Sequence, residues 1–462
     1  MSPVKSPELT PPRRAYMAHL AARARPGLLW MIVFVGVLNF LPAMFEERGT
    51  VTQDPAVWKL TKDIPLVLLL VGAALMPGRK WDRDRYVGAR QPGQVRAVVA
   101  LLLWAAYVVG DGIGRGVSAS GFLVSFRYYV AYPLLVLAMV RLSPTIADIK
   151  AILQGIVVLG ALQGLIAIPN VFGLVGARYP SQARVGDFIV HRAVGTLGNP
   201  DNLGLFLGLP ASILLAAALA GTRESDRLVS RRALWVLLSA ILLGIVLSFS
   251  KTAFVALGVT LGAQMLVIRG SSRGSRTLRK AALVFAAMAL LALVASALRS
   301  GGQLSIPALL GTRTTTNPAA FQEWTQSPTT FVVGEGVGSQ IVAHGASVVP
   351  LSRTDDMFLS LALEGGLVGL LLFGAVVAMT LAWLSRISLG NTLRRPEIAG
   401  LWGYIVFFLL YTPLALNFRL FPGSLLFWMA IGLAIVLVTK TLSAMPSESS
   451  ANDPFQPNPK VL

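Results

Sequence analysis

Two adjacent aspartates stand immediately before one of the longest apolar stretches of the chain. Asp355 and Asp356 follow Arg353, and the apolar run begins at Met357 and continues for about 28 residues, long enough to cross a bilayer as a helix. A carboxylate at such a place can act as a general base, and an arginine can hold an anion. We interpret the aspartates as candidate catalytic residues and Arg353 as a candidate anion ligand. In the alternative, the two aspartates only stabilise the N-terminus of the helix, where the helix dipole favours negative charge.

A second polar cluster lies earlier in the chain, directly before the apolar run 201–221. The segment HRAVGTLGNPDN contains His191, Arg192, Asn199 and Asn202. A helix start offers backbone N–H groups, and an arginine beside it completes an anion site. Arg192 is therefore a second candidate anion ligand, with the other three residues as secondary candidates. In the alternative, these residues only cap an ordinary helix.

Two more cations stand within apolar surroundings. Lys251 lies in SFSKTAF, in a tight turn between two apolar runs; it can bind phosphate as a point charge or extend toward lipid headgroups. Arg127 lies in SFRYY inside an apolar run, where it is either buried for function or close to the membrane surface. The long polar segment before the paired aspartates adds three titratable candidates: Arg313, Glu335 and His344.

The elements that must position these residues are apolar helices. The 462-residue chain is 55% hydrophobic and 13% charged, whereas a soluble protein carries about 25% charged residues. Runs near the length that spans a bilayer recur throughout, which predicts an all-α polytopic membrane protein with about twelve transmembrane helices. The predicted runs are 28–45, 61–77, 95–110, 122–141, 150–173, 201–221, 233–249, 252–269, 281–298, 357–384, 398–417 and 421–441.

The net charge of +19 indicates topology rather than a nucleic-acid partner. Most of the 40 Lys and Arg residues lie in the tails and in alternate connections between the predicted spans. Because positively charged connections face the cytoplasm, both termini are predicted to be cytoplasmic. The excess charge is then expected to contact anionic membrane lipids, and no nucleic-acid partner is expected.

We expect one membrane domain, residues 27–442, between polar tails 1–26 and 443–462 that are predicted to be disordered in the cytoplasm. Its two long connections, 174–200 and 299–356, are predicted to be external, and the second lies between helices nine and ten. Connections of this length are usually functional or disordered, and the aromatic residues and the GEGVGS cluster in the second favour an ordered cap. Two-half transporters instead place a cytoplasmic linker between helices six and seven, which here is short.

The sequence lacks the residues that several kinds of chemistry require. The chain has no cysteine and three histidines, which excludes thiolate chemistry and leaves little room for a histidine metal site; we expect no metal and no cofactor. No GxxxxGK[ST] segment is present, which excludes a P-loop ATPase. The single Asp-x-Asp, at Asp82 and Asp84, is surrounded by arginine and lysine that repel a divalent cation. Cytosolic nucleotide-sugar chemistry is therefore not expected.

Taken in order, these segments resemble the superfamily of O-antigen polymerases and O-antigen ligases, which are glycosyltransferases of the bacterial envelope. The family's arginine–glycine–asparagine segment is matched by RAVGTLGNPDN (192–202), and its Ser-x-Ser-Arg turn by SFSK (248–251), with lysine in place of arginine. Its glycine loop and following helix are matched by GEGVGS (334–339) and DDMFLSLALEGGLVG (355–369). The resemblance covers roughly residues 190–375.

The resemblance implies a fold like that of the C-type glycosyltransferases and a metal-independent transfer without a cofactor. The donor would be an undecaprenyl-pyrophosphate-linked oligosaccharide on the outer, periplasmic face of the bacterial cytoplasmic membrane, and the acceptor a sugar hydroxyl. Arg192, Lys251 and Arg353 would bind the pyrophosphate. A chain-length regulator or a flippase would be a further partner.

The position of Asp355 bears on which reaction is expected. Many members carry His-Asn where this chain has Asp355 and Asp356, and ligases are expected to use a histidine in the large external loop as base. The aspartate favours a polysaccharide polymerase with Asp355 as base, while Asp356 caps the helix or bonds to Arg353. Ligation of the glycan to lipid A core is the alternative, and transport of a polyprenyl-linked glycan or lipid is a further one.

Overall fold

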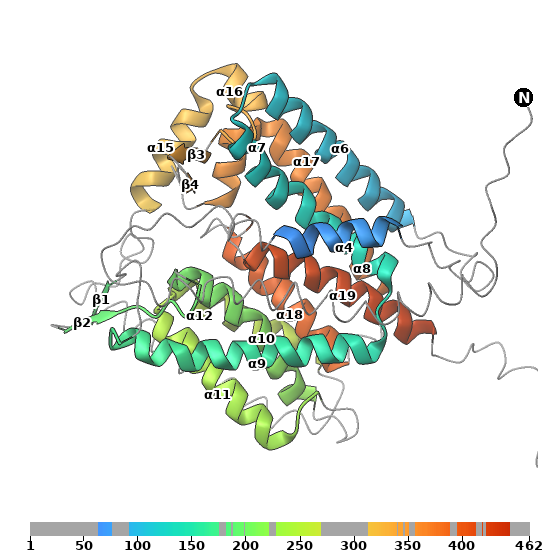
Figure 1. Cartoon of the computed structure of the whole chain (residues 1–462), viewed down its shortest axis with the longest axis vertical. Coiled ribbons are helices and arrows are strands. Elements are labelled where there is room, and N and C mark those ends of the chain that lie inside the picture. The colour runs from blue at the N-terminus through green and yellow to red at the C-terminus, as the bar shows by residue number, and fades with distance from the viewer. Residues whose placement is uncertain are drawn as a thin grey trace, which may run out of the picture.

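The computed structural model describes residues 63–75, 92–174, 182–185, 188–197, 199–220, 228–268, 313–339, 341–344, 347–350, 356–388, 395–412, 418 and 422–443. Within these residues the chain is helical apart from two short β hairpins (Figure 1). The helices are α4 (Asp63–Leu75), α6 (Pro92–Gly114), α7 (Ala119–Phe126), η1 (Arg127–Ala131), α8 (Tyr132–Leu142), α9 (Ile146–Val171), α10 (Pro200–Ala220), α11 (Arg231–Ser248), α12 (Lys251–Ile268), α15 (Arg313–Thr325), α16 (Pro328–Val333), α17 (Met357–Ile387), α18 (Pro396–Tyr411) and α19 (Gly423–Ser443). The antiparallel hairpins pair β1 (Gln182–Val185) with β2 (Phe188–His191) and β3 (Ile341–His344) with β4 (Ser347–Pro350).

Ten of the twelve predicted apolar runs coincide with described helices to within a few residues at most ends. The runs 28–45 and 281–298 lie outside the described residues, as do both tails apart from Ser443. Seven described helical stretches are long and apolar enough to cross a membrane: α6, the continuous stretch from α7 to α8, α9, α10, α11, α17 and α19. The chain is therefore a helical, multi-pass membrane protein, and the number of twelve spans stays a prediction.

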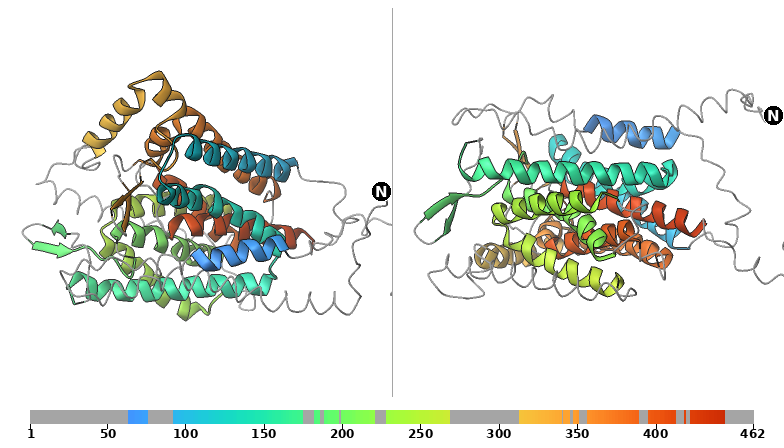
Figure 2. Two further views of the ribbon diagram at one scale, coloured as in Figure 1. Left: turned by 45° about the horizontal axis from the view of Figure 1, so that its top comes forward. Right: turned by 90° about the horizontal axis from the view of Figure 1, so that it is seen from below.

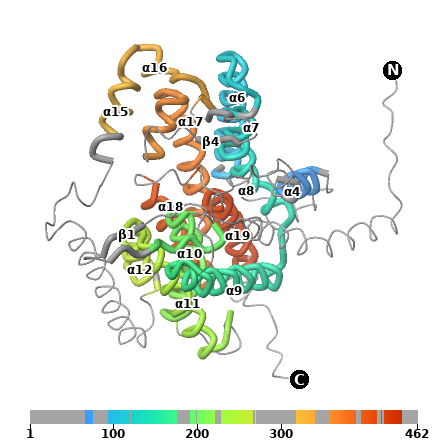
Figure 3. The backbone as a smooth tube through the Cα atoms, turned by 60° about the vertical axis from the view of Figure 1, so that its left-hand side comes forward, coloured from blue at the N-terminus to red at the C-terminus, as the bar shows by residue number. Residues whose placement is uncertain are grey.

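The helices run back and forth, so both hairpins lie toward the same end of the helix bundle (Figure 2). Helix α19 passes through its centre, and its residues 425–438 are all buried, with α8, α17 and α18 packed around them. Helix α10 is similarly covered by α9, α11, α12 and α18. In Figure 3, α6, α7 and α17 form one group of helices and α9 to α12 another, with α18 and α19 between them.

The sequence has GxxxG spacing, typical of close helix packing, at Gly160/Gly164, Gly204/Gly208 and Gly258/Gly262, and the first two pairs make such contacts. A Cβ on Gly164 of α9 would collide with the Ala240 carbonyl of α11, and a Cβ on Gly208 of α10 would collide with the Phe407 ring of α18. Small residues let membrane helices approach in this way. Gly262 of the third pair has nothing within 4 Å of an added Cβ, so its spacing does not mark a tight contact.

The predicted run 122–141 forms a single span built of α7, the π-helical turn η1 and α8. In η1 the Tyr132 amide donates to the Arg127 carbonyl, five residues back rather than four. The Tyr129 carbonyl accepts from Trp104 Nε1 of α6 at 2.8 Å. A π turn of this kind often marks a functional position, and Arg127 stands at its start.

Helix α17 is interrupted near its N-terminal end, which corrects the expectation of one continuous helix of about 28 residues. Gly366 has φ 60° and ψ −163°, a conformation that only glycine adopts without strain. A short helical segment therefore ends at Gly365, and a longer one continues to Ile387. An apolar sequence with two adjacent glycines fits both forms, so the pattern alone did not show the break.

Candidate functional site

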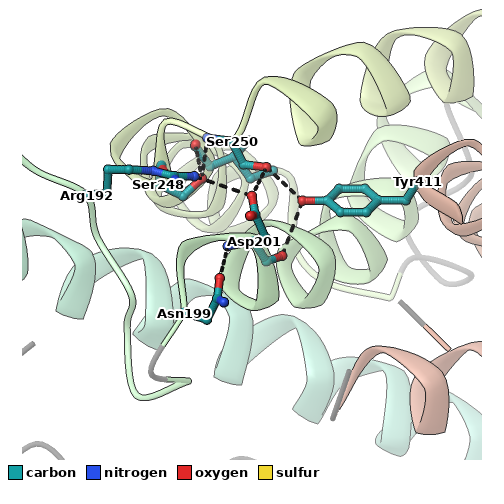
Figure 4. A network of polar contacts seen from close by, with 7 residues as sticks. Arg192, Asn199, Asp201, Ser248, Ser250 and Tyr411 are labelled. Carbon is teal, nitrogen blue, oxygen red and sulfur yellow. Dashed lines mark hydrogen bonds and ion pairs between the residues drawn. The ribbon is translucent and has the colours of Figure 1, made fainter. Parts of the chain in front are cut away.

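Arg192 links two segments that are far apart in the sequence. It follows strand β2, and its guanidinium lies against the turn between α11 and α12 (Figure 4). Its Nε donates to the Ser248 carbonyl at 3.0 Å, and its Nη2 donates to Asp201 Oδ1 at 3.3 Å. The side chain of Arg192 is 17% exposed and that of Asp201 34%. The ion pair is thus partly shielded but still within reach of a ligand.

A chain of hydroxyl groups extends from this ion pair (Figure 4). Ser250 Oγ donates to Asp201 Oδ1 at 2.9 Å, because a carboxylate only accepts. Ser250 Oγ has then used its one hydrogen, so it accepts from Tyr411 Oη, which lies 2.7 Å away at the end of α18. The single Tyr411 hydrogen is shared with the Asp201 carbonyl oxygen, which lies 3.3 Å from Oη. Three helices, α10, α12 and α18, are joined at this point.

The segment that carries Arg192 is fixed by amide side chains of α9. Gln163 and Thr196 exchange two hydrogen bonds, of 2.7 and 2.9 Å, and Asn170 Oδ1 accepts from the Gly195 amide at 2.8 Å. Gly195 has φ +57°, and a Cβ there would collide with Gln163 Oε1. These buried contacts explain why the segment contains glycine and threonine after the arginine, and they hold its backbone in one path.

The turn between α11 and α12 carries Lys251. Phe249 ends α11 with φ +49°, and Ser248 Oγ bonds back to the Ile245 carbonyl at 2.7 Å while accepting from the Ser250 amide at 3.3 Å. Lys251 is the first residue of α12, directly after the serine that bonds Asp201. The structure thus brings Arg192 into contact with the turn that holds Lys251. Arg353, the third candidate cation, lies outside the described residues.

The secondary candidates of the first segment have different positions. Asn199 Oδ1 accepts from the Asp201 amide at 2.8 Å, so Asn199 caps the start of α10. Asn202 Oδ1 is buried and has no hydrogen-bond partner within the described part of the chain. His191 ends strand β2, opposite Gln182 in the hairpin, and is partly exposed.

Asp356 caps helix α17. Its Oδ1 accepts from the amides of Phe358 and Leu359 at 2.7 and 3.2 Å, which is the capping role expected for it. Burial raises the pKa of the Asp356 carboxyl above its ordinary value, while the hydrogen bonds from these two amides oppose that shift. Asp355, the favoured base, lies outside the described residues and its role stays a prediction.

The break in α17 is closed by the glycine loop, residues 334–338. The Glu335 amide donates to the Leu363 carbonyl and the Gly336 amide to the Glu364 carbonyl, both at 2.8 Å. A Cβ on Gly334 would overlap the Glu364 carbonyl, and one on Gly366 would overlap the carbonyl of Val332. We call this contact between the loop and residues 363–366 the glycine seam. It gives the carbonyls of the interrupted helix the donors that α17 itself does not supply.

Helix α6 and the turn after it support the glycine seam from the other side. Tyr107 Oη donates to the Gly365 carbonyl at 2.7 Å. Asp111 Oδ2 accepts from the Val337 amide at 2.6 Å, and Arg115 Nε lies 3.6 Å from Asp111 Oδ1. Helices α15 and α16, which come before the glycine loop in the sequence, pack against α17.

The remaining candidates are spread over other elements. The Arg127 guanidinium lies over the Tyr128 ring, 4.6 Å from its centre. Glu335 is partly buried within the glycine loop. Arg313 begins α15 and His344 ends β3, so both belong to the connection predicted to be external.

Sequence reasoning missed three polar residues that organise these contacts. Asp111 was detectable, because it is an acid directly after the apolar run 95–110, and ionisable residues in a membrane helix are rare and usually functional. Tyr107 and Tyr411 were not, since tyrosines near helix ends are common in membrane proteins. Asp201 and Ser250 lie within the segments that the sequence singled out, next to the candidates Asn202 and Lys251.

Comparison with known proteins adds no assignment, because no protein-family model and no curated protein matches the chain. Within the described ranges, no group of three or more His, Asp or Glu side chains is placed to hold a metal ion. The chemistry that the site can perform is set by the ion pair, the hydroxyl chain and the turn that leads to Lys251.

Proposed function

We propose that the protein is a polysaccharide polymerase of the bacterial cytoplasmic membrane. It would transfer glycan from an undecaprenyl-pyrophosphate-linked donor to an acceptor sugar hydroxyl on the outer face. The observation that supports the proposal is the contact of Arg192 with the Ser248 carbonyl, because it brings the segment of one candidate phosphate ligand against the turn that leads to the other, Lys251. Both segments belong to the resemblance with O-antigen polymerases and ligases.

The proposed reaction needs no nucleotide, because the donor carries its own leaving group. The acceptor hydroxyl oxygen bonds to the anomeric carbon of the donor while the bond from that carbon to the pyrophosphate oxygen breaks. Undecaprenyl pyrophosphate leaves with the electron pair, and the hydroxyl proton passes to a carboxylate, for which Asp355 is the candidate. Arg192 and Lys251, together with Arg353, would stabilise the charge that develops on the pyrophosphate.

Two alternatives use the same donor lipid. An O-antigen ligase would transfer the glycan to lipid A core instead of to another glycan, and a transporter would move the lipid without changing it. The aspartate at position 355, where a ligase is expected to carry histidine, supports the polymerase. The extended connection before α17, which has no counterpart in the two-half transporter design, supports an enzyme.

The first test is topological. We expect Gln322→Cys, on the exposed surface of α15, to react with a membrane-impermeant maleimide in right-side-out vesicles. Ser385→Cys, exposed in the last turn of α17, should react only after permeabilisation, because positively charged connections face the cytoplasm. The chain has no cysteine, so each variant reports a single site. Labelling in the reverse pattern contradicts a site on the outer face.

The second test is turnover. Purified protein in nanodiscs, given only an undecaprenyl-pyrophosphate oligosaccharide, should lengthen the glycan and release undecaprenyl pyrophosphate, because no other energy source is required. Mass spectrometry of the glycan and the lipid follows both products. Transfer that occurs only when lipid A core is added identifies the ligase. Movement of an unchanged lipid across a vesicle membrane, without product, rejects the transferase.

A further inference from the structure

Asp201 has two hydrogen-bond donors on one oxygen. Oδ1 accepts from Arg192 Nη2 at 3.3 Å and from Ser250 Oγ at 2.9 Å. The serine contact is the shorter, and Tyr411 supports it through its own hydrogen bond to Ser250 Oγ. The backbone of Asp201 is held separately, since Asn199 accepts from its amide and Tyr411 reaches its carbonyl. The carboxylate therefore keeps its position and a donor even without the arginine.

The same carboxylate occupies the edge of Arg192 that a phosphate group would use. Nε and Nη2 form one of the paired donor edges of a guanidinium, the geometry that suits two oxygens of a phosphate. In this structure that edge is directed to two acceptors within the protein, the Ser248 carbonyl and the Asp201 carboxylate. A diphosphate that takes this Nε–Nη2 edge must displace Asp201 from Nη2, and the displaced carboxylate then lies beside it as a like charge.

We propose that Asp201 is a placeholder anion for the diphosphate group of the lipid donor. It balances the Arg192 charge before the diphosphate binds, passes to Ser250 alone when the diphosphate takes Nη2, and returns to the arginine when the product leaves. By competing for Arg192 it weakens diphosphate binding and speeds release. The inference rests on the proposed function for its ligand, a lipid-linked diphosphate, and adds how the same site releases that ligand.

The test is a binding titration with full-length protein in nanodiscs of neutral lipid, first with inorganic pyrophosphate. Asp201→Asn removes the charge but keeps an oxygen that can accept from Ser250. We expect it to bind pyrophosphate roughly five- to tenfold more tightly than the unaltered protein, because a nearby negative charge is removed. Asp201→Ser should change affinity in the same direction, which covers the case that one variant fails to fold.

A matched control separates a local effect from a change in total charge. Glu397 lies in the first turn of α18, at the opposite end of the helix from Tyr411, and its Oε1 is 3.5 Å from Lys150 Nζ. Glu397→Gln removes one negative charge, as Asp201→Asn does, and should leave pyrophosphate affinity unchanged. Tightening of similar size in both variants overturns the placeholder role. So does weaker or unchanged binding in the Asp201 variants, or no binding by any of the proteins.

Undecaprenyl pyrophosphate embedded in the nanodisc provides the second arm. The Asp201 variants should also bind this lipid more tightly than the unaltered protein. If only the affinity for inorganic pyrophosphate increases, Arg192 binds a free anion and the proposal is overturned. Under turnover, Asp201→Asn should lower KM for the donor and also lower kcat, a combination that loss of a merely structural contact does not produce. Binding is measured without catalysis, so a protein that binds diphosphate with this pattern but transfers no glycan rejects the proposed function and leaves the placeholder standing.

Discussion

Arg192→Ala is expected to lower kcat/KM for glycan transfer by roughly 10²- to 10³-fold, the effect of removing one preorganised donor from a developing oxyanion. The guanidinium is fixed by the Ser248 carbonyl and by Asp201, so no other side chain takes its place without a shift of the turn. Arg192→Lys should recover only part of the loss, because an ammonium carries the charge but lacks the planar fork. Transfer is measured on an undecaprenyl-pyrophosphate oligosaccharide in nanodiscs.

The comparison for this prediction is Arg386→Ala. Arg386 is an exposed arginine in the last turn of α17, so its loss changes the net charge equally and should leave transfer within about twofold, as expected for a surface site. Melting curves of all variants show whether the protein stays folded. Near-normal transfer by folded Arg192→Ala would show that Arg192 takes no part in the reaction.

Gly366→Ala is expected to destabilise the protein by about 3 kcal/mol or more. Alanine does not tolerate φ 60° with ψ −163°, and its Cβ would overlap the Val332 carbonyl, so the glycine seam has to open. For a protein of this size the melting temperature should fall by roughly 5 °C or more. Thermal unfolding of the purified protein in one detergent measures the change.

Gly374→Ala is the matched variant on the same helix. Nothing lies within 4 Å of a Cβ at Gly374, which is in the regular part of α17, and alanine is the better helix former by about 1 kcal/mol. Its melting temperature should therefore be unchanged or slightly higher. Equal stability of Gly366→Ala and Gly374→Ala would mean that the seam contributes nothing to the fold.

The apolar runs predicted the helices because a membrane allows few other forms. Inside lipid each backbone group needs a partner within the protein, which a regular helix supplies from its own segment, so length and hydropathy alone indicated spans such as α9 and α10. The break at Gly366 did not follow from the sequence, since two glycines in an apolar run are equally typical of close helix packing. Its cause lies in a loop some thirty residues earlier, and no local pattern connects the two.

The site was predictable in part for a similar reason. Arg192 and Lys251 stand out because charges are rare in such a chain, and the structure joins their segments through the Ser248 carbonyl. The partner residue Tyr411 is an ordinary tyrosine at the end of a helix, and it became visible only through its 2.7 Å contact with Ser250. The sequence does not show which common residues pair over a long distance along the chain.

The glycine seam also imposes an order on the biogenesis of the protein. A helix that ends within the apolar layer leaves carbonyls without donors, at several kcal/mol for each group. The donors for Leu363 and Glu364 come from the loop synthesised just before α17, but the donor for Gly365 is Tyr107, 258 residues earlier. The Gly365 carbonyl therefore has no such donor until α17 packs against α6, and α6 must remain accessible while the 258 residues between Tyr107 and Gly365 are added.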